Sequence, residues 1–169
     1  MRERNSLSKI LSLNVRGIRD ATKRRGTFSY LKDEKAAVYF LQETYSEKED
    51  ETVWKKEWGG DIIFSHGSNR SRGVCILIDP SENIKSEHSF KDSNGRIVLT
   101  TIEFNGFQLS LCNVYAPNNL QKQIVFMQEL SGFLIGKSEI TSLIVGGDWN
   151  CTLAKKDKTG FLEIQQCSS

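Results

Sequence analysis

Residues 95–117, GRIVLTTIEFNGFQLSLCNVYAP, contain two β-rich runs joined by the dipeptide Asn105-Gly106. Asn-Gly between two such runs is a strong short-range signal for a β-hairpin, because the tight turn needs positive φ angles that both residues tolerate. A hairpin makes neighbouring strands antiparallel, which excludes a purely parallel, doubly wound sheet. We therefore predict an α/β fold in which hairpins alternate with crossover connections, and a two-sheet α/β sandwich fits this pattern best.

The rest of the chain supplies further strands and helices in a mixed order. Apolar or β-rich runs predict strands at 10–15, 36–44, 61–67, 73–79 and 143–150. Helices are predicted at 20–34, around Trp54 and Trp58, and at 119–136, where Ile124, Met127, Leu130 and Leu134 recur with helical spacing. The total, with the hairpin, is about seven strands and about three helices, without an internal repeat or a linker.

The composition is that of a single globular domain. The chain has 169 residues, of which 38% are hydrophobic and 26% charged, and this excludes disordered and collagen-like proteins. Its net charge of +2 is too small to imply a nucleic-acid partner by itself. The cysteines form no CxxC pair and the histidines lack zinc-ligand spacing, so we expect a reduced, intracellular protein. The apolar run near the N-terminus is short and interrupted, so neither a signal peptide nor a transmembrane segment is expected.

Polar side chains gather where the predicted strands end. The residues at or just after such ends are Asn14, Glu43, Tyr115, Asn118, Asp148 and Asn150. Ligand sites in α/β sheets favour these positions, which makes the set a candidate site. Each residue alone also has an ordinary explanation, because Asn and Asp are common turn formers and a tyrosine is common in a core.

The segment LIVGGDWNCTL, residues 143–153, contains two of these residues at a spacing of two. On an extended chain this spacing sends Asp148 and Asn150 to one side and Trp149 to the other. Gly146 and Gly147 precede them, and glycines at such a point indicate either a close approach of backbone or ligand, or a bulge.

The chain resembles a known family over most of its length. The segments that carry the resemblance are SLNVRGIR, YFLQETY, WGGDIIFSHGSNRSRGVCILID, NGRIVLTTIEF, LCNVYAPN and LIVGGDWNCTL. In this order they are similar to the motifs of the endonuclease/exonuclease/phosphatase superfamily, in particular the apurinic-type endonuclease domain of non-LTR (LINE-type) retrotransposons. The resemblance implies a DNase I-like, four-layer α/β sandwich over residues 8–160, followed by a short divergent tail at 161–169.

The resemblance also implies a role for each candidate residue. Glu43 matches the family's metal-binding glutamate, with Mg²⁺ as the expected ion and Mn²⁺ as the alternative, and Asn14 matches the asparagine that orders the metal site. Asp148 matches the aspartate that orients or deprotonates the attacking water, while Asn150 and Tyr115 match residues that hydrogen-bond the scissile phosphate. Two further residues, Arg96 and Asn118, are expected to bind substrate, although Arg96 also fits an ordinary strand-edge cation.

The sequence departs from the family pattern after Asn150. The family has a later Asp-His pair, whereas this sequence contains only Asp157 beyond that point and no histidine. We therefore expect the N-terminal portion of the domain, a sandwich incomplete at its C-terminal side, and weak or no activity. His66 and His88 match no family position and are both expected at the surface.

Three groups of basic residues flank the predicted site and could follow a phosphate backbone. They are Arg19 with Lys23, Arg24 and Arg25; Arg70 with Arg72; and Lys155 with Lys156 and Lys158. A solvated basic surface balanced by the acidic run at 47–51 explains the same pattern. The family resemblance makes DNA the expected partner, with a nuclear location for a functional protein, and no membrane partner is expected.

Three hypotheses of function follow from these observations. The first is Mg²⁺-dependent DNA nicking by a retrotransposon-type endonuclease. The second is a non-catalytic, transposon-derived fragment that binds nucleic acid weakly or not at all. The third keeps the fold but changes the substrate to a phosphoinositide or a sphingolipid, and it ranks lower because the sequence shows no membrane-facing apolar segment.

Overall fold

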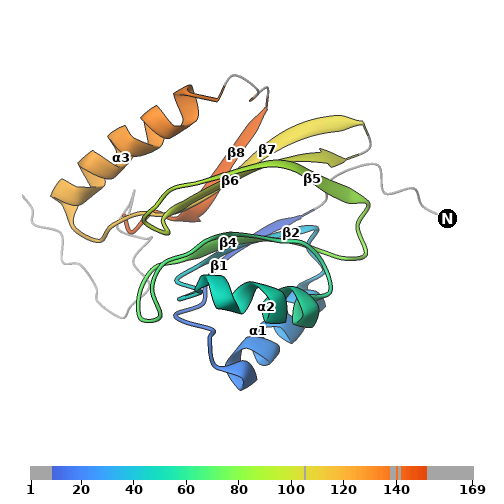
Figure 1. Cartoon of the computed structure of the whole chain (residues 1–169). Helices are drawn as coiled ribbons and strands as arrows, with labels where there is room; N and C mark the ends of the chain where they lie inside the picture. The colour runs from blue at the N-terminus through green and yellow to red at the C-terminus, as the bar shows by residue number, and fades with distance from the viewer. Residues whose placement is uncertain (1–8, 105, 138–139, 141, 152–169) are drawn as a thin grey trace, which may run out of the picture.

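The computed structural model describes residues 9–104, 106–137, 140 and 142–151, and these form two β-sheets that face each other. The first sheet has the order β1-β2-β4-β3 and the second the order β5-β6-β7-β8 (Figure 1). Their bounds are β1 Ile10–Asn14, β2 Val38–Gln42, β3 Ile62–Ser65, β4 Val74–Ile78, β5 Ile84–Lys91, β6 Ile97–Phe104, β7 Phe107–Tyr115 and β8 Leu143–Asp148.

Both sheets mix parallel and antiparallel pairs. Strands β6 and β7 form the expected antiparallel hairpin, with Phe104 opposite Phe107, and Gly106 has a φ of 78° in the connection. Strands β1 and β2 are parallel, as are β7 and β8, and a helix lies in the connection of each parallel pair. The prediction of a two-sheet α/β sandwich is therefore confirmed.

The helices cover the outer faces of the two sheets (Figure 1). Helices α1 (Ala21–Glu34) and α2 (Glu51–Trp58), the latter preceded by the short 3-10 helix η1 (Lys48–Asp50), cover the first sheet, and α3 (Leu120–Ile135) covers the second. This is the four-layer arrangement that the family resemblance implies. No helix in the described part of the chain is both long and apolar enough to span a bilayer.

Local sequence explains where α1 and α2 begin and end. The Asp20 side chain accepts a hydrogen bond from Lys23 N and caps the first turn of α1. Helix α2 ends at Gly59, whose φ of 84° is the left-handed conformation that terminates many helices. The two predicted helical tryptophans, Trp54 and Trp58, are buried against the first sheet.

Helix α3 lies where the sequence predicts it, but it buries a different face. Phe126 and Leu130 are buried against the second sheet, whereas Ile124 is 58% exposed and Met127 51% exposed. The predicted face was therefore wrong for these two residues. The helix carries apolar side chains around much of its circumference, so its sequence fits two faces, and only packing against the sheet selects one of them.

Three apolar layers hold the sandwich together. One lies between the first sheet and helices α1 and α2, one lies between the two sheets, and one lies between the second sheet and α3. The middle layer includes Phe40, Ile76 and Val98 from opposing strands. Because each sheet is covered on both faces, every residue of β2 and β4 is buried, and every one except Gln42 is apolar.

Strand β5 has no counterpart among the predicted strands. Its sequence, IKSEHSFK, is mostly polar, and most of its residues are exposed because the strand lies at the edge of the second sheet. The pairing with β6 also shifts between Ser86 and Ser89, which interrupts the alternation of inward and outward residues. His88 lies on this strand and is exposed, as the sequence analysis expected.

Candidate active site

Four of the predicted residues meet at one end of the sandwich because their strands end there. Asn14 is the last residue of β1, and Glu43 follows β2, its parallel neighbour in the first sheet. Tyr115 ends β7 and Asp148 ends β8, and these two residues are partners in the parallel ladder of the second sheet. The carboxyl ends of both parallel pairs thus face each other across the two sheets.

The side chain of Asn14 joins the two sheets at this point. Its Nδ2 donates to Glu43 Oε1 at 2.9 Å and to Asp148 Oδ2 at 2.8 Å, so one amide serves carboxylates from different sheets. Its Oδ1 accepts from Arg16 N at 3.1 Å, which orients the amide. Without this donor, the two carboxylates would face each other and repel.

Glu43 is surrounded by hydrogen-bond donors. Tyr115 donates its hydroxyl to Oε1 at 2.8 Å and Tyr45 donates to Oε2 at 3.1 Å, in addition to the bond from Asn14. Partial burial raises the pKa of Glu43, but these hydrogen bonds and the charge of Arg16 outweigh burial, and the pKa lies below its ordinary value. Glu43 is therefore a carboxylate at neutral pH.

Tyr115 is held as a neutral donor. Burial and the neighbouring Glu43 carboxylate raise the pKa of Tyr115 to about 12. Arg96 fixes the strand end, because its Nη1 donates to the Tyr115 carbonyl oxygen at 2.9 Å and its guanidinium lies over the Tyr115 ring, 5.2 Å from the centroid.

Asn150 lies beside Asp148 for a reason other than strand alternation. Strand β8 ends at Asp148, and Asn150 has a φ of 49°, so the extended chain expected through residue 150 stops two residues earlier. The backbone N–H of Asn150 donates to Asp148 Oδ1 at 3.0 Å, and its Nδ2 donates to the Ala116 carbonyl at 2.7 Å. Trp149 points the other way, toward the layer under α3.

Gly147 is required by the close approach of two strands. It has a φ of 135°, and a Cβ at this position would overlap the backbone of Val114, the partner of Gly147 on β7. Of the two explanations that the sequence left open, close backbone approach is the one observed, because the ladder runs without a register shift from Leu143 to Asp148.

Backbone strain is concentrated at this end of the molecule. The described non-glycine residues with positive φ are Arg16, Lys35, Glu43, Tyr45, Arg72 and Asn150. Lys35 simply ends α1, whereas the other five surround the site. For residues other than glycine, a backbone conformation with positive φ costs energy and persists only where the surrounding contacts impose it. Such strained residues are typical of functional sites.

A buried polar bridge positions the strands that carry Glu43 and Tyr115. Gln42 Nε2 donates to Asn113 Oδ1 at 2.8 Å, and Asn113 Nδ2 donates to the carbonyls of Leu41 and Cys75 at 2.9 and 2.8 Å. Both side chains are fully or almost fully buried between the sheets. Sequence reasoning missed this pair, although a Gln and an Asn inside otherwise apolar strands were a visible signal.

A pocket of about 360 Å³ opens beside these residues. Its lining includes Glu43, Tyr115, Arg96 and Asn118, which brings four of the seven predicted site residues around one space. Asn14, Asp148 and Asn150 are linked to it by the hydrogen bonds above but do not line it. Within the described ranges, no three His, Cys, Asp or Glu side chains converge as a metal cluster, so any metal would depend on few protein ligands.

The sequence pattern of the Endonuclease/Exonuclease/phosphatase family matches residues 11–167. The chain belongs to this family. A protein of Xenopus laevis, the Transposon TX1 uncharacterized 149 kDa protein, is 32% identical over 149 residues, which cover 88% of this chain and 11% of that protein. The chain therefore spans a small part of this relative.

Two solved structures share the fold. D. rerio TDP2, solved with a single-strand DNA product, superposes with a TM-score of 0.62 at 24% identity, over 85% of this chain and 60% of that chain. An AP endonuclease from Archaeoglobus fulgidus gives a TM-score of 0.63 at 22% identity, over 83% of this chain and 56% of that chain. The DNase I-like architecture expected of the family is thus confirmed.

The predicted basic groups near Glu43 and Asp148 differ in whether they form ion pairs. Arg19 forms ion pairs with Glu47 and Asp50, and Arg24 is buried with Nε 2.6 Å from Glu57 Oε2. Arg25 pairs with the same glutamate, so this group is largely neutralised by acidic neighbours. The group at residues 155–158 and the predicted tail at 161–169 lie outside the described residues.

His66 is not a surface residue, contrary to the sequence expectation. Its side chain is 16% exposed and stacks on Phe64. Nδ1 lies 3.1 Å from Ser46 Oγ, and Nε2 lies 2.9 Å from Glu51 Oε1. The loop that carries His66 folds back onto the segment after β2, and sequence alone does not show that long-range contact.

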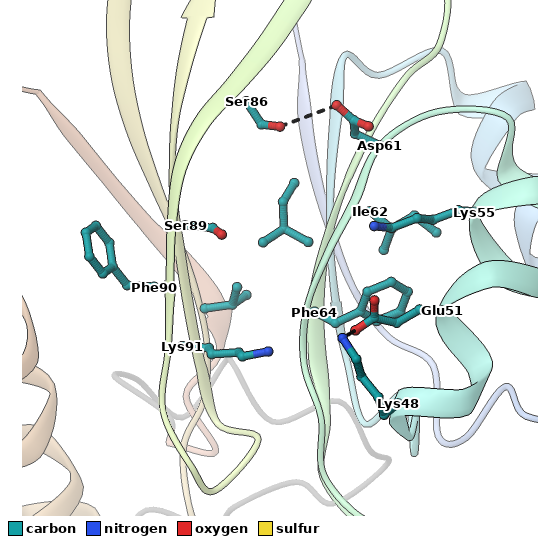
Figure 2. Close-up of a pocket in the computed structure, with 12 residues that line it drawn as sticks. Lys48, Glu51, Lys55, Asp61, Ile62, Phe64, Ser86, Ser89, Phe90 and Lys91 are labelled. Atoms are coloured by element: carbon teal, nitrogen blue, oxygen red, sulfur yellow. Dashed lines mark hydrogen bonds and ion pairs between the residues drawn. The ribbon is translucent and has the colours of Figure 1, made fainter.

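A second hollow of about 320 Å³ lies between the edges of the two sheets, away from the family site (Figure 2). Its charged groups are partly paired, because Lys48 binds Glu51 at 3.0 Å and Ser86 Oγ donates to Asp61 at 3.3 Å. None of the seven predicted site residues lines it.

Proposed function

We propose that this chain carries a divalent-metal-dependent phosphodiesterase site that acts on DNA, as part of a non-LTR retrotransposon endonuclease. The observation that supports this best is the Asn14 amide, which donates to Glu43 and Asp148 from two different sheets. Similarity to the transposon TX1 protein and to TDP2 solved with single-strand DNA supports DNA as the substrate. With chromosomal DNA as its substrate, the protein would act in the nucleus.

The residues around Glu43 suit a hard divalent cation. Glu43 is ionised at neutral pH, and Glu43 and Asp148, joined through Asn14, offer carboxylate oxygens, which Mg²⁺ prefers, with Mn²⁺ as the alternative ion. We assign Glu43 as the ligand and Asn14 as the residue that fixes its carboxylate. Waters and a substrate phosphate supply the remaining ligands at such sites, and the bound ion stabilises charge that develops on a phosphate oxygen.

The other residues act on the water and the phosphate. Asp148 is the group that orients or deprotonates the attacking water, because Asn14 and the Asn150 backbone N–H hold its two oxygens in a fixed orientation. Tyr115 remains protonated and donates to the phosphate once substrate draws its hydroxyl from Glu43, and the Asn150 amide is the second such donor. Arg96 and Asn118 bind the substrate from the walls of the pocket.

We further propose that the chain on its own nicks DNA weakly. The sequence contains two histidines, and neither is hydrogen-bonded to Glu43 or Asp148, because His66 is bonded to Ser46 and Glu51 and His88 is exposed on β5. The same observation favours the second candidate, a non-catalytic fragment that binds nucleic acid weakly or not at all.

Nicking of supercoiled plasmid in Mg²⁺ or Mn²⁺ tests the proposal. Glu43→Gln and Asp148→Asn are each expected to lower the nicking rate by about 10²-fold or more. Glu49→Gln is the matched control, since Glu49 is exposed on η1, and it is expected to leave the rate unchanged. Nicking that survives both site substitutions would contradict the site assignment, and its absence in wild type with either metal would favour the non-catalytic candidate.

A further inference from the structure

The pocket beside Glu43 contains more positive charge than its single carboxylate balances. Its charged lining consists of Glu43 together with Arg72, Arg96 and Lys122. Among the described residues, none of these three cations forms an ion pair. This distinguishes them from Arg19, Arg24 and Arg25, which are paired with acidic side chains near the same end of the molecule.

The three cations come from separate parts of the chain and are anchored independently. Arg96 is half-buried, stacks on Tyr115 and donates to the Tyr115 carbonyl. Arg72 has a φ of 62°, and its carbonyl accepts from Tyr45 N at 2.9 Å, which ties it to the segment that carries Glu43. Lys122 lies in the first turn of α3, which Asn119 caps.

Arg72 and Arg96 are close enough to affect each other. Burial is the larger cause of the lowered pKa of Arg96, and the positive charge of Arg72 is the next. Two like charges held close together without an ion-pair partner cost energy in the free protein, and an anion bound between them lowers that cost. The fixed loop at Ser68 and Ser71, which bridge each other, keeps Arg72 at this position.

We propose that Arg72, Arg96 and Lys122 form a subsite for the phosphodiester that neighbours the scissile one on a nucleic-acid strand. This inference rests on the proposed function, because it takes Glu43 and Tyr115 as the groups that face the scissile phosphate. It implies that the strand leaves the site across the β6–β7 and α3 side, toward Asn118 and Lys122, and that substrates with a single phosphodiester miss these contacts.

Binding of a fluorescein-labelled single-stranded DNA of about ten nucleotides, measured by anisotropy in EDTA, tests the subsite without any catalysis. Arg72→Gln and Lys122→Gln are each expected to weaken binding by about tenfold. Each is also expected to make the plot of the logarithm of the binding constant against the logarithm of the salt concentration less steep, by about 0.7 in slope between about 50 and 200 mM salt. Lys56→Gln and Lys85→Gln change the net charge equally on exposed side chains and are expected to stay within about twofold of wild type.

The outcomes separate this inference from the proposed function. If Arg72→Gln and Lys122→Gln bind like the two controls, or if wild type does not retain the DNA, the subsite is wrong whatever the nicking assay shows. If the subsite variants weaken binding while nicking is absent or insensitive to Glu43→Gln, the subsite stands as a nucleic-acid contact and the catalytic assignment fails. A methylphosphonate oligonucleotide, which lacks the backbone charge, is expected to bind wild type and Arg72→Gln equally.

Discussion

The buried bridge between Gln42 and Asn113 makes a quantitative prediction about stability. Asn113 takes part in three hydrogen bonds of 2.8 to 2.9 Å inside the sandwich, one from Gln42 and two to the carbonyls of Leu41 and Cys75. Asn113→Leu keeps the branched shape and the number of side-chain heavy atoms but removes all three bonds. At about 1 kcal/mol of net stability for each bond, the substitution should lower the free energy of unfolding by about 3 kcal/mol.

Thr100→Val is the matched control for this prediction. Thr100 is equally buried, but its hydroxyl makes a single bond, to the His88 carbonyl at 3.0 Å, so the expected loss is about 1 kcal/mol. Urea unfolding followed by tryptophan fluorescence measures both, because Trp54 and Trp58 are buried in the core. An Asn113→Leu loss no greater than that of Thr100→Val would refute the reasoning that the bridge stabilises the pairing of the sheets.

A double substitution isolates the bond between the two side chains. Gln42 keeps contacts with Ser12 Oγ and the Phe40 carbonyl when Asn113 is removed, so only one bond is shared by the pair. The coupling energy between Gln42→Leu and Asn113→Leu should therefore be about 1 kcal/mol. A coupling near zero would mean that the two side chains contribute independently.

Three further predictions concern acid stability, the β7–β8 approach and the thiols. Because the folded-state pKa of Glu43 is lowered, its contribution to the free energy of unfolding is present above the ordinary carboxyl pKa of about 4.3 and is lost as the pH falls through the lower folded value. Glu43→Gln should therefore reduce the loss of stability at acid pH, measured as the free energy of unfolding against pH. An unchanged loss at acid pH would contradict this prediction. Gly147→Ala should cost about 1–3 kcal/mol in the same urea assay, whereas Gly26→Ala, which meets open space on α1, should be neutral or stabilising, and equal effects would refute the close-approach argument. Burial raises the pKa of the Cys112 thiol to about 12, so it should stay unlabelled by a thiol reagent in the native state while exposed Cys151 reacts, and peptide mapping that finds equal labelling would count against the burial.

Local signals were enough to predict most of the fold. The Asn-Gly hairpin, the helix at 20–34 and the apolar runs each depend on neighbours in sequence, and all three lie where they were expected. Strand β5 was missed because an exposed edge strand with a bulge has neither a continuous apolar run nor a clean alternation. The buried face of α3 was misassigned because the choice between its two apolar faces is made by the sheet.

The site was predictable to the extent that its residues lie at strand ends. Asn14, Glu43, Tyr115 and Asp148 were found in this way, and their hydrogen bonds now show how they meet. The positions of Arg72 and Lys122 beside the pocket and the pairing of Arg24 with Glu57 depend on contacts between segments distant in sequence. Spacing along the chain carries no information about such contacts. The surface prediction for His66 was wrong for the same reason.

Asn14 and Asp148 are the last residues of β1 and β8, and in the described part of the chain each of these strands pairs on one side only. Within the described residues the outer backbone groups of both strands have no ladder partner, so an additional strand, including one from another molecule, could pair with them. A strand added there would lock the tips that hold the carboxylates, so self-association of the protein and the geometry of its site are coupled. We expect any nicking rate per molecule to depend on protein concentration, and a short β-strand peptide directed at β8 to change that rate without touching Glu43.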